Sequence, residues 1–439
     1  MTGADAATSD TIPGAPGSSL RRVAAIDIGT NSTHLLVAAV DPNLRTFSIV
    51  LAEKSTTRLG ERDPVTDHLS EAAITRGMDA LRQFTELAAS HQVEQIVTAA
   101  TSAVREAPNG RDFLQQIKDE LDLDVDLVSG PEEARLIYLG VLSGMSFGDR
   151  PHLLLDIGGG STELILADGR DARALTSTRI GAVRLQRDFV TEDPLPAQSQ
   201  AFLRAYIQGS LEPAVDKVRR RLHAGEQPVL VATSGTAMAI GALAASHDDR
   251  APRKLHGYRI ARARLEQVVD RLVVLTPEER KALSPINDRR AEIIVPGALI
   301  LQTTMQMLGV EEMVLSERAL REGLIVDWML HQVLLEHQVL VVQEETQELL
   351  PVIVLDKVEL EELVDKAVLE APAELVVHGV MPGLQALVEL QETQELQVVQ
   401  VLTETMAVVL AVVQALAVLA VLVVLPEALA DITYKIVIT

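Results

Sequence analysis

The sequence LLLDIGGGSTELIL at residues 153–166 has two apolar runs of strand length on either side of a turn made almost wholly of glycine. Glycine lacks a Cβ, so the turn can adopt positive φ and bring its backbone N–H groups close to an anion. Asp156 ends the first run and Glu163 begins the second. Two carboxylates and several anion-binding donors within one turn suit a complex of Mg²⁺ with phosphate. The alternative is an ordinary β-hairpin, although such a hairpin requires fewer glycines.

The same pattern occurs earlier in the chain. Residues 25–32, AIDIGTNS, align without a gap with residues 154–161, LLDIGGGS. Asp27 precedes Asp156 by 129 residues, which is the length of a domain rather than of a short repeat. We therefore predict two related α/β domains, each with an aspartate next to a phosphate-binding turn. A cleft between the two domains is the expected site, because a ligand there can be held from both sides.

Length and composition limit the class of protein. A chain of 439 residues is long enough for two or three domains. It has no cysteine, which excludes disulfides and thiolate chemistry and suits a reducing compartment, so we expect a cytoplasmic protein. The formal net charge of −23 argues against a nucleic-acid partner. Residues 1–20 are rich in small and polar residues and lack an apolar run, which predicts a disordered tail rather than a signal peptide or membrane anchor.

Apolar periodicity places the main elements around these turns. A three-stranded meander is predicted at residues 23–28, 34–40 and 47–51. Further strands are predicted at residues 95–99, 125–128 and 229–233. Helices are predicted over residues 71–90, 113–121, 210–223 and 288–301, with a last helix that begins at Leu315.

Two segments of the first domain carry further candidate residues. Arg105 lies just beyond a strand end, as a phosphate contact would, although an isolated arginine is more commonly a surface residue. Glu132 and Glu133 follow Pro131 at the start of a predicted helix. They either complement the helix dipole or include a general base for water. A base at a helix start is expected to stay ionised and to be only weakly basic.

A third unit of strand, small-residue turn and helix occurs at residues 229–238. Ser234, Gly235 and Thr236 form its turn, and their small donors suit a phosphate or a nucleotide at a helix N-terminus.

Together these segments resemble a known family. Residues 21 to about 330 are similar to the exopolyphosphatase and guanosine pentaphosphate phosphohydrolase family. The matching stretches, in the order of that family, are residues 27–32, 101–109, 129–140, 156–163, 181–185, 232–238 and 320–324. The resemblance implies an actin-like α/β architecture, in which two ribonuclease H-like domains enclose a phosphate site. The domains would be residues 21–145 and 146–330. In the alternative, the last helix, about 316–330, packs against the first domain.

The resemblance also implies roles for residues at matching positions. Glu133 corresponds to the catalytic base, and Arg105 to a catalytic side chain that neutralises phosphate. Asp156 corresponds to the carboxylate that binds Mg²⁺, with Glu163 assisting, and Asp27 is its counterpart in the first domain. The predicted phosphate-binding residues of the three turns are Thr30, Asn31, Ser32, Gly158, Gly159, Gly160, Ser161, Ser234, Gly235 and Thr236.

The implied activity is that of a Mg²⁺-dependent exopolyphosphatase, which releases orthophosphate from the end of inorganic polyphosphate by attack of a water that Glu133 deprotonates. A guanosine pentaphosphate 5′-phosphatase is the first alternative, since nothing in the sequence specifies a guanine pocket. A non-catalytic actin-like protein that binds nucleotide is the second. We expect a homodimer as the only macromolecular partner, and no membrane.

Residues 331–439 depart from the family. Its longer members carry a helical domain with His-Asp pairs, whereas none of the three histidines here precedes aspartate. This segment has 17 acidic and three basic residues and repeats the sequence ETQEL at residues 345–349 and 392–396. We predict an atypical helical region of low complexity, without an assigned function. Residues 406–425 are long and apolar enough for a membrane span but lack flanking lysine or arginine, so a buried helix or an aggregation-prone stretch is favoured.

Overall fold

The computed structural model describes residues 20–345, except residues 149, 247, 249, 250, 285 and 287, and except the side chains of residues 288, 289 and 333–345. The chain divides into two units, Met1–Val341 and Val342–Thr439, and the account below concerns the first. The predicted tail at residues 1–19 and the predictions for residues 346–439, including the apolar segment 406–425, lie outside the described residues.

The first sheet has five strands in the order β3-β2-β1-β4-β5. Strands β1, β2 and β3 form an antiparallel meander, and β4 and β5 continue the sheet in parallel with β1. Their bounds are β1 Arg21–Ile28, β2 Thr33–Asp41, β3 Thr46–Ser55, β4 Gln95–Ala100 and β5 Asp126–Leu127. The meander predicted from the sequence is therefore confirmed.

The second sheet repeats this topology. Its order is β10-β11-β9-β6-β7-β8, in which β6, β7 and β8 form the antiparallel meander and β9 and β11 are the parallel strands. The added edge strand β10 pairs antiparallel with β11. The bounds are β6 His152–Ile157, β7 Thr162–Ala167, β8 Ala172–Thr178, β9 Val229–Thr233, β10 Arg259–Ala261 and β11 Glu312–Leu315. Two sheets of the same order confirm the two related α/β domains that the aligned turns predicted, and they give the ribonuclease H-like, actin-like fold that the family resemblance implied.

The two aligned turns have the same backbone hydrogen bond. The N–H of Gly29 donates to the carbonyl of Ser32 at 3.1 Å, and the N–H of Gly158 donates to the carbonyl of Ser161 at 3.0 Å. Each turn joins the first two strands of its meander. The alignment made from the sequence thus pairs positions that are structurally equivalent.

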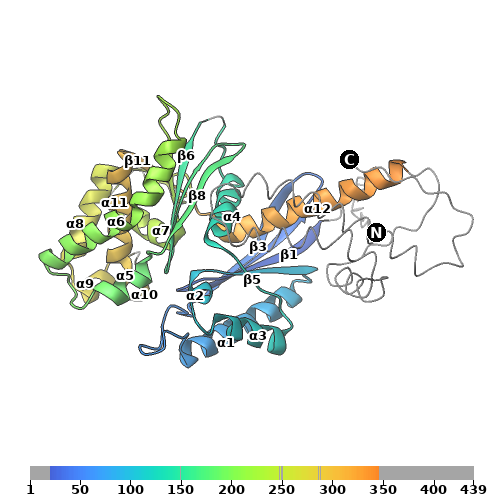
Figure 1. Ribbon diagram of the computed structural model, residues 1–439, viewed down its shortest axis with the longest axis horizontal. Helices are drawn as coiled ribbons and strands as arrows, with labels where there is room; N and C mark the ends of the chain where they lie inside the picture. The colour runs from blue at the N-terminus through green and yellow to red at the C-terminus, as the bar shows by residue number, and fades with distance from the viewer. Residues whose placement is uncertain are drawn as a thin grey trace, which may run out of the picture. The chain divides into compact units, whose positions relative to one another are not determined.

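Helices cover the outer faces of both sheets (Figure 1). The first lobe consists of the first sheet with α1 Glu71–Ser90, α2 Ser102–Arg105 and α3 Gly110–Leu121. The second lobe consists of the second sheet with α5 Ala182–Phe189, α6 Ala197–Arg221, α7 Ser234–Ala245, α8 Arg262–Val274, α9 Pro277–Lys281, α10 Asp288–Ala291 and α11 Ile294–Leu308. Between the sheets lies a helix layer formed by α4 Gly130–Leu142 and α12 Leu320–Glu345.

Alternate side chains along each central strand pack into different hydrophobic cores. In β1, Ala24 and Ile26 pack under α1 and α3, whereas Val23 and Ala25 face the helix layer. Leu154 of β6 faces the same layer from the second sheet. Because side chains alternate along a strand, the segments Val23–Ile26 of β1 and Leu153–Leu155 of β6, which directly precede the two aspartates, are apolar and buried on both faces. The helix layer is thus a core that the two lobes share.

Hydrogen bonds hold α12 against the first sheet and against α4. The indole N–H of Trp328 donates to the side-chain oxygen of Gln95 at the start of β4, at 2.7 Å. Arg135 of α4 forms a 2.7 Å ion pair with Asp327.

The structure corrects two predicted helix boundaries. The single helix expected over residues 288–301 is interrupted, with α10 ending at Ala291 and α11 beginning at Ile294. This break places Pro296 in the first turn of α11, where a residue without an N–H costs no helical hydrogen bond. The last helix begins at Leu320, and Leu315 instead ends β11, since its apolar run pairs with β9 as a buried strand.

Candidate active site

A cleft of about 310 Å³ lies between the two lobes. It is lined by both aspartate-containing turns, by Glu133 of the helix layer and by the turn that precedes α7. Of the predicted site residues, those that line it are Asp27, Thr30, Asn31, Ser32, Glu133, Asp156, Gly158, Gly159, Gly160, Ser161, Glu163, Ser234, Gly235 and Thr236. The structure therefore brings together residues from four separate parts of the sequence.

Strand register places two carboxylates side by side in the second lobe. Asp156 of β6 and Glu163 of β7 are direct partners in an antiparallel pair, so their side chains project from the same face. Both are buried, with 8% and 1% of their surface exposed. Burial and the nearby Glu133 raise the pKa of Asp156 to about 7. Burial, Glu133 and Asp156 raise the pKa of Glu163, and a 2.7 Å hydrogen bond from Ser177 opposes this change.

Asp27 faces these carboxylates from the first lobe. Burial and the charges of Glu133 and Asp156 raise the pKa of Asp27 to about 7, although Arg321 acts in the opposite direction. Within the described part of the chain, neither Asp27 nor Asp156 forms an ion pair with a lysine, arginine or histidine. Carboxylates that crowd together without a cation form an environment suited to a hard metal ion.

Glu133 lies in the first turn of α4, where the Ser129 hydroxyl caps the helix by accepting from the N–H of Glu132. The structure differs from our expectation of weak basicity at this helix start. Glu133 is only 7% exposed, and this burial raises the pKa of its carboxyl, in spite of the opposing charge of Arg105. Desolvation therefore outweighs the helix dipole, and the group is a better proton acceptor near neutral pH than its position in the sequence suggests.

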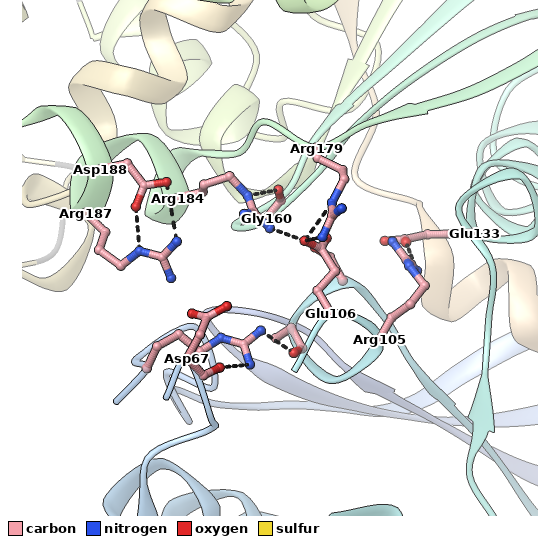
Figure 2. Close-up of polar contacts among 12 residues, drawn as sticks. Asp67, Arg105, Glu106, Glu133, Gly160, Arg179, Arg184, Arg187 and Asp188 are labelled. Carbon is pink, nitrogen blue, oxygen red and sulfur yellow. Dashed lines mark hydrogen bonds and ion pairs between the residues drawn. The ribbon is translucent and has the colours of Figure 1, made fainter. Parts of the chain in front are cut away.

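Arg105 does not line this cleft and borders a neighbouring hollow together with Ser177 and Lys217, so its phosphate contact stays a prediction. Its guanidinium donates at 3.0 Å to the Oε2 of Glu133 (Figure 2) and at 2.7 Å to the carbonyl of Val128. The structure thus places Arg105 behind Glu133, where it orients that carboxylate.

The glycine turn is held by the start of α5, which it contacts through three successive carbonyls. The carbonyl of Gly158 accepts from the N–H of Ala182 at 3.0 Å. The carbonyl of Gly159 accepts from the N–H groups of the next two residues, at 2.9 and 3.0 Å. The carbonyl of Gly160 accepts from the Nε of Arg184 at 3.0 Å.

These three contacts fix the direction of the donors in the turn. In a planar trans peptide, a carbonyl and the following N–H point in opposite directions. The N–H groups of Gly159, Gly160 and Ser161 therefore point away from the first turn of α5. Among the described residues, no backbone or side-chain group accepts from them. The turn thus presents three unpaired donors from residues that line the cleft, as an anion-binding nest does.

The third turn contributes a strained residue. Ser234, the first residue of α7, has φ of +85°, which is unfavourable for any residue except glycine. Such strain is retained where the surrounding structure requires it, commonly at functional sites. The next residue, Gly235, lies so close to the guanidinium of Arg290 that a Cβ there would collide with it. Gly235 therefore makes room for a cation at the cleft.

A group of basic residues that sequence patterns did not reveal also lines the cleft. Its charged members, here called the cationic wall, are Lys54, Arg290 and Arg321, and the imidazole of His34 lies next to Lys54. Partial desolvation in the cleft and the nearby Arg290 and Arg321 lower the pKa of Lys54 to about 8, although the residue remains exposed on one side. Burial and the same neighbours lower the pKa of His34 to about 3, so that the imidazole is neutral. Positive groups held this close together favour a ligand with several negative charges.

Strand register was the signal that could have found His34, whereas Lys54 lies beyond the strand predicted at residues 47–51. His34 is the partner of Asp27 across β1 and β2, and Lys54 is the partner of His34 across β2 and β3. The equivalent row in the second lobe is Asp156, Glu163 and Ser177. Each row thus begins with an aspartate at the equivalent position, Asp27 or Asp156. Only the row of the first lobe continues with basic residues.

The carboxylates predict how stability depends on pH when metal ions are chelated. Asp27 has a pKa near 7 in the folded state and 3.8 in the unfolded state, so the folded protein binds this proton more tightly. The stabilisation that comes from binding the proton is therefore lost as pH rises from about 4 to about 7. We expect Asp27→Asn to remove this loss. In EDTA, the free energy of unfolding of this variant, measured by urea denaturation, should therefore exceed that of the wild type increasingly between pH 5 and pH 8. Equal values at every pH would show that the pKa of Asp27 is not raised.

The described residues contain neither a preformed metal cluster nor a membrane-spanning helix. No three carboxylate, imidazole or thiol groups in this part of the chain converge closely enough to form a metal site by themselves. Over the same residues, no helix is both sufficiently long and sufficiently apolar to cross a bilayer.

Comparisons with known proteins agree on one family. The model of the Ppx/GppA phosphatase family matches residues 36–332. Exopolyphosphatase 2 of Mycobacterium tuberculosis is 32% identical over 316 residues, which cover 70% of this chain and 98% of that protein. Exopolyphosphatase 1 of Mycobacterium leprae is 32% identical over 311 residues, which cover 69% of this chain and 88% of that protein.

Solved structures show the same relationship. The crystal structure of an exopolyphosphatase from Cytophaga hutchinsonii has a TM-score of 0.65 and 26% identity, and the match covers 70% of this chain and 98% of that chain. The Ppx/GppA family member of Aquifex aeolicus has a TM-score of 0.60 and 28% identity, with 71% of this chain and 99% of that chain covered. In sequence and in fold, the chain described here belongs to the Ppx/GppA phosphatase family.

Proposed function

We propose that this protein is an exopolyphosphatase, which hydrolyses the terminal phosphoanhydride of inorganic polyphosphate and releases orthophosphate. Membership of the Ppx/GppA phosphatase family makes the chain a hydrolase of phosphoanhydrides. The observation that carries the proposal is that the cleft is lined both by the carboxylates of Asp27, Asp156 and Glu163, here called its acidic half, and by the cationic wall. A polyanion whose terminal phosphate carries a divalent cation matches both groups.

Magnesium fits the acidic half. Mg²⁺ prefers oxygen ligands and is commonly held by one or two carboxylates together with the phosphates of the substrate. Asp156 and Glu163 would hold it from the second lobe and Asp27 from the first, with the remaining ligands from substrate and water. The bound ion would neutralise charge on the phosphate oxygens. This donor set also explains why buried carboxylates are tolerated without a cationic partner.

Glu133 is the proposed general base. It lines the cleft beside the acidic half, and its buried carboxyl has a raised pKa. A water between Glu133 and the terminal phosphorus would transfer a proton to this carboxylate. At the same time the water oxygen would attack the phosphorus, and the bond from phosphorus to the bridging oxygen would break. Arg105 holds the Oε2 of Glu133 at 3.0 Å, which orients the carboxylate toward the water. A protein that only binds a nucleotide has no need for such a base, so the structure favours an enzyme over an actin-like binder.

The remaining groups bind phosphate. The N–H groups of Gly159, Gly160 and Ser161 would bind the terminal phosphate, with the side chains of the first-lobe turn, including Thr30, opposite them. Charge that develops on the phosphate oxygens during attack would be stabilised by these fixed donors. The cationic wall would bind the rest of the chain, which leaves as polyphosphate shortened by one unit.

Parallel assays of phosphate release from polyphosphate, guanosine pentaphosphate and ATP test the proposal. We expect the highest kcat/KM for polyphosphate in the presence of Mg²⁺. Preference for guanosine pentaphosphate would instead assign the 5′-phosphatase activity, which needs the same base and the same phosphate turn. Binding of these compounds without any phosphate release would overturn the enzymatic proposal.

The cationic wall predicts an effect on KM. Lys54→Gln removes one of its charges, and we expect KM for polyphosphate to rise about tenfold with little change in kcat. The pKa of Lys54 near 8 further predicts that kcat/KM of the wild type falls as pH rises through 8, because the free enzyme loses this charge. Steady-state kinetics between pH 6.5 and 9.5 measure both effects.

Two variants serve as controls for Lys54. Lys54→Arg keeps the charge above pH 8 and should remove the alkaline decrease. Lys118→Gln changes a lysine of α3 that forms ion pairs with Asp122 and Asp124 and does not line the cleft, so its KM should stay that of the wild type. Equal KM values for all three variants would contradict the role of the wall.

A further inference from the structure

Glu106 connects the two lobes next to the cleft. It follows α2 in the first lobe, and its Oε2 accepts from Arg179 and from Arg184 of the second lobe, each at 2.5 Å (Figure 2). Its Oε1 accepts from the hydroxyl of Ser102 at 2.7 Å. The side chain is only 9% exposed, so its ion pair with the partly buried Arg184 is largely shielded from solvent. The hydrogen bonds and cations lower the pKa of Glu106 despite its burial, which keeps the group ionised.

The two arginines differ in what else they contact. Arg184 is 22% exposed, and while its NH2 group binds Glu106, its Nε donates to the carbonyl of Gly160 at 3.0 Å. Arg179 is 72% exposed, and both of its hydrogen bonds go to the same oxygen of Glu106. Arg184 alone of the two therefore joins the carboxylate of the first lobe to the phosphate turn of the second.

We propose that Arg184 and Glu106 form a positioning pair, which sets the orientation of the glycine turn relative to the first lobe and thereby to the general base. The proposal rests on the proposed phosphatase function. Arg184 fixes the carbonyl of Gly160, and the N–H of Ser161 consequently points in the opposite direction. Glu106 directly follows Arg105, the residue that holds Glu133. One short path thus links the phosphate donors to the base, through the contacts of Arg184, the peptide bond between Glu106 and Arg105, and the ion pair of Arg105 with Glu133.

The packing of Gly160 shows how little freedom this arrangement has. A Cβ on Gly160 would lie 2.5 Å from the hydroxyl of Ser102 and 2.9 Å from that of Thr30, so the turn lies directly against the first lobe. Ser102 is also the residue that donates to Glu106. The guanidinium of Arg184 can span the carbonyl and the carboxylate because its donors form a rigid planar fork. A lysine at this position has a single ammonium and lacks that geometry.

The test compares four single variants by steady-state kinetics with polyphosphate. Arg184→Gln removes both contacts, Glu106→Gln removes the anionic anchor, and Arg179→Gln removes only the exposed ion pair. Arg58→Gln removes a different ion pair between the lobes, that of Arg58 with Glu292 at 3.1 Å. A misplacement of a catalytic group by about 1 Å costs on the order of 100-fold in rate.

We expect Arg184→Gln to lower kcat about 100-fold and Glu106→Gln about 30-fold, with KM changed less than about threefold. Arg179→Gln and Arg58→Gln should keep kcat within about twofold of the wild type, since exposed ion pairs contribute little. The double variant Glu106→Gln with Arg184→Gln should be no slower than Arg184→Gln, because both substitutions break one path. Arg184→Lys should not restore the rate, whereas Glu106→Asp should restore part of it.

Thermal unfolding and substrate binding separate this role from a general loss of structure. Each variant should keep the wild-type Tm within a few degrees and should bind tripolyphosphate in EDTA with unchanged affinity. A low Tm together with weak binding in Arg184→Gln would indicate a structural role and overturn the proposal. Equal kcat for Arg184→Gln and Arg179→Gln, with an active wild type, would overturn the positioning role alone. A wild type without phosphate release would overturn the proposed function and this role with it.

Discussion

Replacement of Glu133 by glutamine is expected to lower kcat for phosphate release from polyphosphate by about 10³-fold, within the range that a general base contributes. The amide has nearly the same shape as the carboxylate and can still accept from Arg105, but it cannot take a proton from water. Binding should survive, because Glu133 does not belong to the cationic wall or to the glycine turn. Single-turnover phosphate release and calorimetric binding of polyphosphate measure the two properties separately.

The adjacent Glu132 provides a matched control. It lies in the same turn of α4, and it pairs with Arg135 at 2.6 Å on the partly exposed side of the helix. The cation that it contacts lowers its pKa, whereas burial raises that of Glu133. Glu132→Gln should therefore keep its turnover. Full activity of Glu133→Gln would exclude Glu133 as the base, and equal losses in both variants would indicate that the start of α4, rather than one carboxylate, is required.

The pair of glutamates also shows where sequence reasoning ends. Both residues follow Pro131 in a capped helix start, and each is equally suited to complement the helix dipole. What separates them is the direction of the side chain, which helix periodicity alone does not give before the packing of α4 between the two sheets is known. Resemblance to a family selected Glu133, and the structure supplies the physical difference, which is burial beside Arg105.

The duplicated fold was predictable because glycine turns and buried strands have strong local patterns. Asp27 and Asp156 each follow a short apolar run, Val23–Ile26 or Leu153–Leu155, and the sheets have the same strand order. The cationic wall was harder to predict from the sequence, since Arg290 and Arg321 reach the cleft only through the arrangement of α10 and α12. For His34, in contrast, the register of the predicted meander would have been enough. Lys54 lies beyond the third strand as predicted, and the pairing of β2 with β3 also shifts its register between Val37 and Ala38.

Arg105 shows a limit of another kind. A positive residue after a strand end predicts a phosphate contact, which is the role that its charge alone suggests. In the structure its guanidinium is used by Glu133 and by the carbonyl of Val128. Residue type and position therefore predicted that Arg105 belongs to the site, whereas its partner could be known only from coordinates.

Replacement of Asp156 by asparagine is expected to change activity and stability in opposite directions. Turnover with Mg²⁺ should fall by about 10³-fold, because a carboxylate that binds the metal contributes several kcal/mol to the transition state. The concentration of Mg²⁺ at half-maximal activity should rise as well. Chelation of metal ions by EDTA should abolish turnover of the wild type, and added Mg²⁺ should restore it.

In EDTA the same substitution should stabilise the protein. Burial and Glu133 raise the pKa of Asp156 to about 7 from 3.8, which means that its charge opposes folding above that pH. A tenfold change in a proton-binding constant between the unfolded and folded states corresponds to about 1.4 kcal/mol, so removal of the charge should raise the Tm at pH 8 by several degrees. Saturating Mg²⁺ should raise the Tm of the wild type and should have less effect on the variant.

Asp168 is the control for this pair of measurements, because it is an aspartate one residue beyond β7 with the opposite electrostatic environment. Its carboxylate accepts from the N–H groups of Arg170 and Asp171 and pairs with Arg173 at 3.0 Å, and these contacts lower its pKa. Asp168→Asn should therefore lower the Tm and leave turnover unchanged. A lower Tm for Asp156→Asn in EDTA would mean that this carboxylate supports the fold, and the acidic half of the cleft would then not be a site held ready for a metal ion.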